Sequence, residues 1–138
     1  MNSLFKVSAK NHAGMILMSI LANRSSIEGD FVSLKEIADE MGLSQKFLEE
    51  IAASLKKSKL IKGRQGPGGG YQLAKSADSI SVYEILVALE GPIAAMSCDG
   101  AFCPVADKCS SKSLWSFLHQ DLIESLKKTS LKKISKSV

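Results

Sequence analysis

Three cysteines lie close together in the second half of this 138-residue chain, at Cys98, Cys103 and Cys109. They are the only cysteines of the sequence, and they stand in the run CDGAFCPVADKC. Thiolates are soft ligands, and this short spacing suits either zinc or an iron–sulfur cluster of the 2Fe–2S or 4Fe–4S type. Spacing alone does not separate zinc from iron–sulfur, and reversible thiol oxidation is a third use of such a run.

An iron–sulfur cluster usually takes four protein ligands, so the cysteine run is one ligand short. The chain has two histidines, His12 and His119, and the run itself contains Asp99 and Asp107. His119 is expected to be solvated or packed between subunits, and the two aspartates are weaker candidates. His12 can be read as a polar residue on the exposed side of the first helix. The residues themselves therefore leave the fourth ligand open.

The composition is that of a globular chain with a mildly basic balance. Hydrophobic residues make up 45% and charged residues 23%, with a formal net charge of +4, which permits nucleic-acid binding without demanding it. Residues 56–64 carry basic side chains and no acidic ones. Residues 127–136 form a second basic run, which we predict to be a frayed, solvated end.

Two further features concern the compartment. No stretch approaches the roughly 18 apolar residues of a membrane helix. The odd number of cysteines argues against a disulfide framework, so the thiols fit a reducing environment. We therefore expect a cytoplasmic protein with no membrane partner.

The elements that must position the cysteine run are mostly helical. Residues 10–23 carry apolar side chains at helical spacing, and Ser81 is predicted to cap a helix over residues 82–89. The cysteine run comes next. Ser113 is then predicted to cap a long last helix with one apolar stripe, made of Trp115, Leu118, Leu122 and Leu126.

The middle of the chain predicts a helix-turn-helix. Ser33 reads as the N-cap of a helix, with Glu36 completing a capping box and Met41 on the apolar face. Gly42 is expected to end this helix in the left-handed conformation, where a missing Cβ removes the strain. Ser44 opens the next helix, and two short helices joined by such a turn are typical of DNA-binding domains.

A small hairpin is predicted after the second of these helices. Residues 60–61 and 71–73 look like two short strands, and the glycine-rich residues 66–70 form the tip between them. The fold class is therefore mostly α with a small β-hairpin wing, a winged helix-turn-helix followed by a long C-terminal helix. The glycine run is not a phosphate-binding loop, because no Lys-Ser/Thr and helix follow it.

The candidate DNA contacts lie on the second helix and on the wing. Gln45 could form hydrogen bonds with adenine, and Glu49 could accept a hydrogen bond from cytosine N4. Arg64 lies at the wing, where an arginine suits a narrow minor groove. Lysines such as Lys46 could contact phosphates. The full set is Ser33, Ser44, Gln45, Lys46, Phe47, Glu49, Lys56, Arg64, Gln65, Gly66, Gly68 and Gly69. The alternative is an ordinary solvated helix face with a glycine turn. Winged helices also serve as protein-interaction modules.

Three motifs resemble the Rrf-two family of bacterial winged-helix regulators, and its IscR- and NsrR-like members in particular. They are residues 32–62, with SLKEIADEMGLSQKFLEEI; residues 66–75, GPGGGYQLAK; and the cysteine run, which follows VYEILVALEG and precedes Leu114-Trp115. The sequence departs from the family pattern at Gln65, where an arginine is usual, and at Lys112, where a histidine stands in some members.

The resemblance implies a homodimeric DNA-binding regulator whose long C-terminal helix pairs two subunits. It also implies that the cysteine loop holds an iron–sulfur cluster. His12 aligns with the position where some members carry an acidic fourth ligand supplied by the other subunit, so the expected ligand set is Cys98, Cys103, Cys109 and His12.

Together these observations predict a winged helix-turn-helix DNA-binding domain over residues 1–78 and a cluster loop with a dimerisation helix and basic tail over residues 79–138. The expected function is a transcriptional regulator, a repressor, that senses iron–sulfur status, redox state or nitric oxide and binds a pseudo-palindromic operator in double-stranded DNA. A zinc-stabilised or thiol-redox regulator, or an interaction module without a cluster, is the alternative. No pattern of catalytic residues indicates an enzyme.

Overall fold

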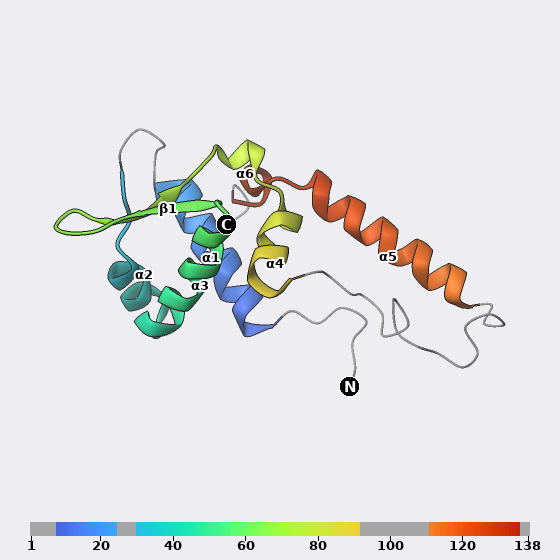
Figure 1. Cartoon of the computed structure of the whole chain (residues 1–138), viewed down its shortest axis with the longest axis horizontal. Helices are drawn as coiled ribbons and strands as arrows, with labels where there is room; N and C mark the ends of the chain where they lie inside the picture. Colours follow the sequence, from blue (N-terminus) through green and yellow to red (C-terminus); the bar gives the residue numbers. More distant parts are fainter. Residues whose placement is uncertain (1–7, 25–29, 92–110, 136–138) are drawn as a thin grey trace.

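The computed structural model describes residues 8–24, 30–91 and 111–135, so the three cysteines lie outside the described residues. The elements follow one another as shown in Figure 1. They are α1 (Ala9–Arg24), α2 (Leu34–Met41), α3 (Gln45–Lys57), β1 (Ile61–Arg64), β2 (Gly70–Leu73), the 3-10 turn η1 (Ala77–Ser79), α4 (Val82–Glu90), α5 (Ser111–Lys128) and α6 (Leu131–Ser135). This mostly helical chain with a hairpin wing confirms the predicted fold class.

The helix-turn-helix of α2 and α3 begins and turns where the sequence predicts. The Ser44 hydroxyl accepts a hydrogen bond from the Phe47 amide at 3.0 Å, and Gly42 lies at φ 67°. Ser33 caps α2, but it accepts from the Lys35 amide at 3.2 Å, so the predicted capping box with Glu36 is wrong.

A reciprocal capping box forms at the start of α4 instead. The Ser81 hydroxyl accepts from the Glu84 amide at 3.1 Å, and the Glu84 carboxylate accepts from the Ser81 amide at 3.2 Å. Two orphan donors of the first helical turn are thus satisfied at once. Ser81 is the N-cap of α4, as predicted.

The wing is a two-stranded antiparallel hairpin with a third segment beside it. Ile61 pairs with Leu73 and Arg64 with Gly70 in the β1–β2 register. On the other edge of β2, Val32 and Tyr71 exchange two backbone hydrogen bonds of 2.8 and 2.9 Å. The segment before α2 therefore fixes the wing against the helix-turn-helix.

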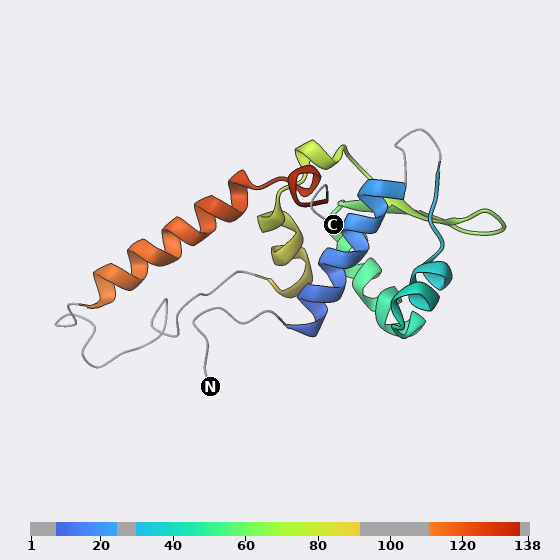
Figure 2. The same ribbon diagram turned by 180° about the vertical axis from the view of Figure 1, so that it is seen from behind.

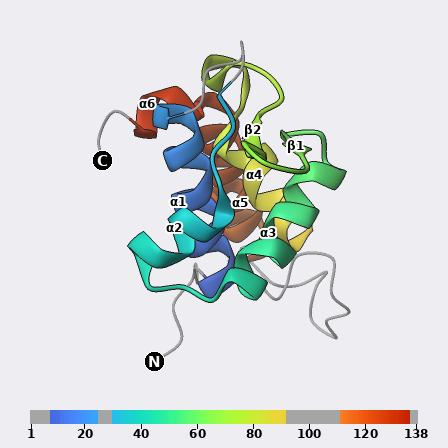
Figure 3. The same cartoon turned by 90° about the vertical axis from the view of Figure 1, so that its left-hand side faces the viewer.

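One hydrophobic core unites the helices and the hairpin. It contains buried side chains of α1, α2, α3 and α4, together with Ile61, Leu73 and Ile80. Helices α1 and α4 approach closely at Gly14, where an added Cβ would lie 2.3 Å from a Leu89 methyl carbon. Figure 3 shows α1, α3 and α4 side by side beneath the hairpin.

The C-terminal basic run corrects a sequence prediction. Instead of a frayed end, residues 131–135 form α6, which packs against α1 with Leu131 fully buried. Its backbone is held by a hydrogen bond from the Leu131 amide to the Ile80 carbonyl at 2.8 Å. Lys132 also pairs with Asp78 at 3.3 Å. The apolar residues Leu131 and Ile134 explain the docking, since a solvated tail would not need them.

Two further predictions change in detail. Helix α5 begins at Ser111, so Ser113 is its third residue and not its N-cap. Met41 does not join the apolar core face of α2, because its side chain is 40% exposed. In the views of Figures 1 and 2, α5 leaves the body of the molecule as a long arm. None of the described helices is long and apolar enough to cross a membrane.

Candidate nucleic-acid interface

Helix α3 presents a polar face to solvent and an apolar face to the core. Leu48, Ile51 and Leu55 are buried, which leaves Gln45 and Glu49 exposed on the opposite side. Lys46 and Lys56 are exposed too, whereas Phe47 is partly buried and packs against the core. The capping hydroxyls of Ser33 and Ser44 already accept backbone hydrogen bonds, and they fix the starts of the two helices.

The two candidate base readers of α3 contact each other. The Gln45 amide nitrogen donates to a Glu49 carboxylate oxygen at 3.5 Å, one helical turn away. Such i, i+4 pairs hold both side chains over one stretch of helix surface. An adenine or cytosine edge approaching this face would therefore meet a paired amide and carboxylate, and it would have to replace their mutual bond.

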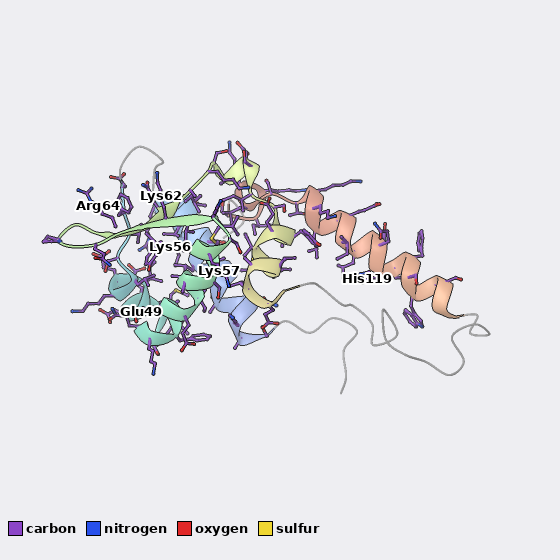
Figure 4. The ribbon with its side chains drawn as sticks, viewed as in Figure 1. Glu49, Lys56, Lys57, Lys62, Arg64 and His119 are labelled. Atoms are coloured by element: carbon purple, nitrogen blue, oxygen red, sulfur yellow. The ribbon has the colours of Figure 1, made fainter. Side chains whose placement is uncertain are left out.

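Basic side chains continue from the end of α3 onto the wing. Lys56 and Lys57 occupy the last turn of α3, and Lys62 and Arg64 lie on β1. All four are exposed, and Figure 4 shows them at the end of the molecule that carries the hairpin. A cluster of this kind suits phosphate contacts.

Arg64 has a defined aromatic neighbour. The carbon of its guanidinium group lies 5.8 Å from the centroid of the Phe31 ring, within the range of a cation–π interaction. Phe31 is not among the contacts predicted from the sequence. The signal available was its place directly before Val32, where an aromatic and a β-branched residue together favour an extended segment.

The wing tip is exposed and depends on glycine. Gln65, Gly66 and Gly68 are exposed, and the two glycines lie at φ 92° and 74°. The turn is closed by a hydrogen bond from the Gly69 amide to the Gly66 carbonyl at 2.9 Å. A Cβ on Gly69 would lie 2.2 Å from the Arg64 carbonyl oxygen, so no larger residue fits there without a backbone shift. The structure thus places the wing candidates of the sequence together.

Of the predicted cluster ligands, the structure describes only His12, since Cys98, Cys103 and Cys109 lie outside the described residues. His12 is exposed on the second turn of α1. Within residues 8–24, 30–91 and 111–135, no three His, Cys, Asp or Glu side chains gather as a metal site. His119 lies on α5, on the far side of the molecule from the wing (Figure 4).

An apolar groove of about 350 Å³ runs along α1, with His12 on its lining. Met15, Ile16 and Ile20 of α1 line it, together with Met41 of α2 and Ile134 of α6. This groove was not predicted from the sequence, because Met41 was expected in the core and the C-terminal run in solvent.

Helix α5 carries an exposed apolar face. Leu114, Phe117 and Leu118 are 52%, 65% and 42% exposed. Trp115 and Leu122 of the predicted stripe are partly buried in the single chain. Exposed apolar patches of this kind mark interaction surfaces.

A bidentate ion pair ties the end of α1 to α2. The Arg24 guanidinium donates to both carboxylate oxygens of Glu40, at 2.8 and 2.6 Å. These hydrogen bonds hold the pKa of Glu40 below its ordinary value and raise the pKa of Arg24. The pair lies at the surface and connects the scaffold helix to the helix-turn-helix.

Comparison with known proteins identifies the scaffold. The family model described as Rrf2, iron-dependent transcriptional regulator, matches residues 7–137. The chain belongs to the Rrf2 family. The resemblance inferred from the three sequence motifs is thereby confirmed, and the family is one of transcriptional regulators.

Among curated relatives, the HTH-type transcriptional regulators IscR of Klebsiella pneumoniae strain 342 and of Escherichia coli strain K12 are each 38% identical over 92 residues. That alignment covers 66% of this chain and only 56–57% of those proteins. The chain therefore aligns with little more than half the length of these curated relatives.

Solved structures resemble nearly the whole chain. CymR of B. subtilis, described as the global cysteine regulator, superposes with a TM-score of 0.81 at 31% identity, covering 97% of this chain and 98% of that one. IscR of T. potens superposes with a TM-score of 0.76 at 35% identity, covering 96% of this chain and 88% of that one. The oxidized form of Staphylococcus aureus CymR superposes with a TM-score of 0.75 at 33% identity, covering 97% of this chain and 98% of that one.

Proposed function

We propose that this Rrf2 regulator is a cytoplasmic homodimer that represses transcription and senses iron–sulfur status, redox state or nitric oxide through a cysteine-bound cluster. The observation that carries the proposal is the run of three cysteines between α4 and α5 of an Rrf2 chain. The 38% identity to IscR regulators over 92 residues adds support.

The donor set suits an iron–sulfur cluster. Cys98, Cys103 and Cys109 supply three thiolates, and the exposed imidazole of His12 is a chemically suitable fourth ligand. A bound cluster would supply a redox-active, nitric-oxide-reactive iron centre to the chain. An imidazole ligand is more easily displaced than a thiolate, which suits a sensor.

The dimer is proposed to form when α5 of each subunit enters the α1 groove of its partner. The exposed face of Leu114, Phe117 and Leu118 is apolar, and so is the groove lined by Ile16 and Ile20. Two such exchanges related by a two-fold axis are self-complementary. Because α5 follows Cys109 closely in the chain, this arrangement favours a fourth ligand from His12 of the partner subunit.

The DNA contacts are proposed to come from the α3 face and the wing. Gln45 and Glu49 are assigned to base edges, Lys46 and Lys56 to phosphates, and Arg64 with Gln65 and the glycine tip to the minor groove. Two subunits related by a two-fold axis would read a pseudo-palindromic operator, one half-site each.

Purification without oxygen tests the cluster. The wild-type protein is expected to absorb visible light and to contain iron and acid-labile sulfide in matching amounts. The Cys103→Ala variant is expected to lose the absorbance, the iron and the sulfide. His12→Ala should shift the spectrum, and His119→Ala is the matched control that should not. A colourless wild-type protein with tightly bound zinc would contradict the iron–sulfur proposal, and unchanged spectra in His12→Ala would remove that ligand.

A second candidate is direct thiol sensing. It is favoured by the likeness to CymR, one structure of which is described as the oxidized form. This candidate predicts that a thiol oxidant changes the DNA affinity of the metal-free protein and that a reductant added afterwards reverses the change. A metal-free protein whose DNA affinity is unaffected by oxidant would exclude it.

A further inference from the structure

The contact between Phe31 and Arg64 concerns the wing rather than the cluster, and it deepens the proposed DNA-reading surface, on which it rests. Phe31 lies just before Val32, whose backbone is bonded to Tyr71 on the outer edge of β2. The segment thus lies antiparallel beside β2 through a single bridge, on the edge opposite β1.

The alternation of side chains in strands decides which residues share a face. Val32 and Tyr71 are paired, so Phe31 projects to the opposite face from Tyr71. Arg64 pairs with Gly70 on β1, and residue 70 also lies on the face opposite Tyr71. Phe31 and Arg64 therefore lie on one face of the hairpin, with Arg64 on β1 and Phe31 on the segment that bridges to the other edge of β2.

Gly70 makes the contact across β2 possible. It offers no side chain on that face, so the Arg64 side chain can extend over β2 towards the ring. Its close approach to Val32, where a Cβ would lie 2.2 Å from the carbonyl oxygen, also holds the Phe31 segment tight against β2. The observed separation of 5.8 Å between guanidinium carbon and ring centroid is the result.

We infer that Phe31 is a positioning residue for DNA recognition, which holds the Arg64 guanidinium extended and ready for the minor groove before DNA arrives. A free arginine side chain loses considerable rotamer freedom on binding, and stacking on an aromatic face removes part of that loss in advance. Phe31 itself does not need to touch DNA. The backbone next to it is bonded to β2 through Val32, so the ring is held beside the arginine by the hairpin itself.

A double-mutant cycle on the full chain tests this role. The probe is a DNA duplex enriched from a random library by the wild-type protein, and the readout is its dissociation constant at several salt concentrations. Phe31→Leu keeps an apolar side chain and removes the ring. It is expected to weaken binding about two- to fivefold, the effect of an exposed cation–π contact.

The coupling to Arg64 separates positioning from a general structural role. In an Arg64→Ala background, Phe31→Leu should have no further effect, and Phe31→Trp in the wild-type background should retain or improve the affinity.

Each contrary outcome has a distinct meaning. If Phe31→Leu weakens binding equally with and without Arg64, or has no effect while Arg64→Ala does, the positioning role is overturned. If the wild-type chain enriches no duplex, or Gln45→Ala, Lys56→Ala and Arg64→Ala all leave binding unchanged, the proposed reading surface itself is wrong and the inference falls with it.

Discussion

At the scale of single residues, the wing is constrained by glycines that differ in what they tolerate. Gly68 lies at φ 74° with open space around it, whereas Gly70 lies at φ 148° with the Val32 backbone directly beside its missing Cβ. Only the second position combines an unusual conformation with a steric conflict. The two sites therefore form a matched pair for experiment.

Gly70→Ala is expected to lower the free energy of unfolding by about 2–4 kcal/mol, because it adds a backbone clash to conformational strain. Gly68→Ala should cost only about 1 kcal/mol, the strain of a left-handed alanine. Urea unfolding followed by circular dichroism measures both. Equal losses at the two positions would mean that the Val32 bridge does not constrain the wing.

The ion pair of Arg24 and Glu40 predicts a pH dependence of stability. The folded pKa of Glu40 lies below its ordinary value, so its stabilising contribution is fully present above that ordinary value and is lost as the pH falls through the folded pKa. Glu40→Gln should therefore be less stable than wild type near neutral pH and match it in acid.

Thermal unfolding across a pH series measures the effect, and high salt should shrink it because the pair is at the surface. Asp39→Asn, an exposed neighbour on α2, is the control and should leave the neutral-pH stability close to wild type. A stability gap between wild type and Glu40→Gln that stays constant down to acid pH would contradict this assignment.

At the scale of elements, α6 shows where sequence reasoning reaches its limit. The residues Leu131 and Ile134 are separated by three positions among lysines, a pattern too short to predict a docked helix. Its partners, α1 and the segment around Ile80, lie far away along the chain. Long-range packing of this kind is not visible in local composition.

Leu131→Ala is expected to destabilise the protein by about 2–5 kcal/mol, since it removes a fully buried side chain from the core. Lys133→Ala, on the exposed side of the same helix, should change stability by no more than about 0.5 kcal/mol. Chemical denaturation compares the two. A Leu131→Ala protein as stable as wild type would show that α6 does not contribute to the core in solution.

Other elements could be predicted because their signals are local. Ser44, Gly42 and Ser81 marked helix ends through side-chain and backbone chemistry that acts within a few residues. The wing followed from its glycine run. The bridge at Val32 could not be predicted, because a single bridging residue has no periodicity of its own.

At the scale of the whole molecule, two apolar surfaces of the described residues remain uncovered, the α1 groove and the α5 face. The proposed two-fold exchange covers both at once. The predicted boundary after residue 78 stays a prediction, although α4 beyond it shares the core of α1 and α3.

Phe117→Asp is expected to raise the dissociation constant of the dimer about 100-fold or more, because it replaces a large apolar contact with a buried charge. Analytical ultracentrifugation over a range of concentrations measures this constant. Gln120→Asp, which adds the same charge at an exposed polar position of α5, is the control and should leave the constant near the wild-type value. A dimer unaffected by Phe117→Asp would place the subunit interface elsewhere.

Thr129, directly after α5, lies beside the start of α4, where its carbonyl accepts a hydrogen bond from the Val82 amide. The stretch of sequence from residue 91 to residue 128 therefore begins at the C-terminal end of α4 and finishes beside its N-terminal end. Because both junctions lie on α4, a change of length or of ligands within this stretch is expected to leave the hairpin and α3 in place. Evolution can therefore exchange what a regulator of this architecture detects while the sequence it reads on DNA stays the same.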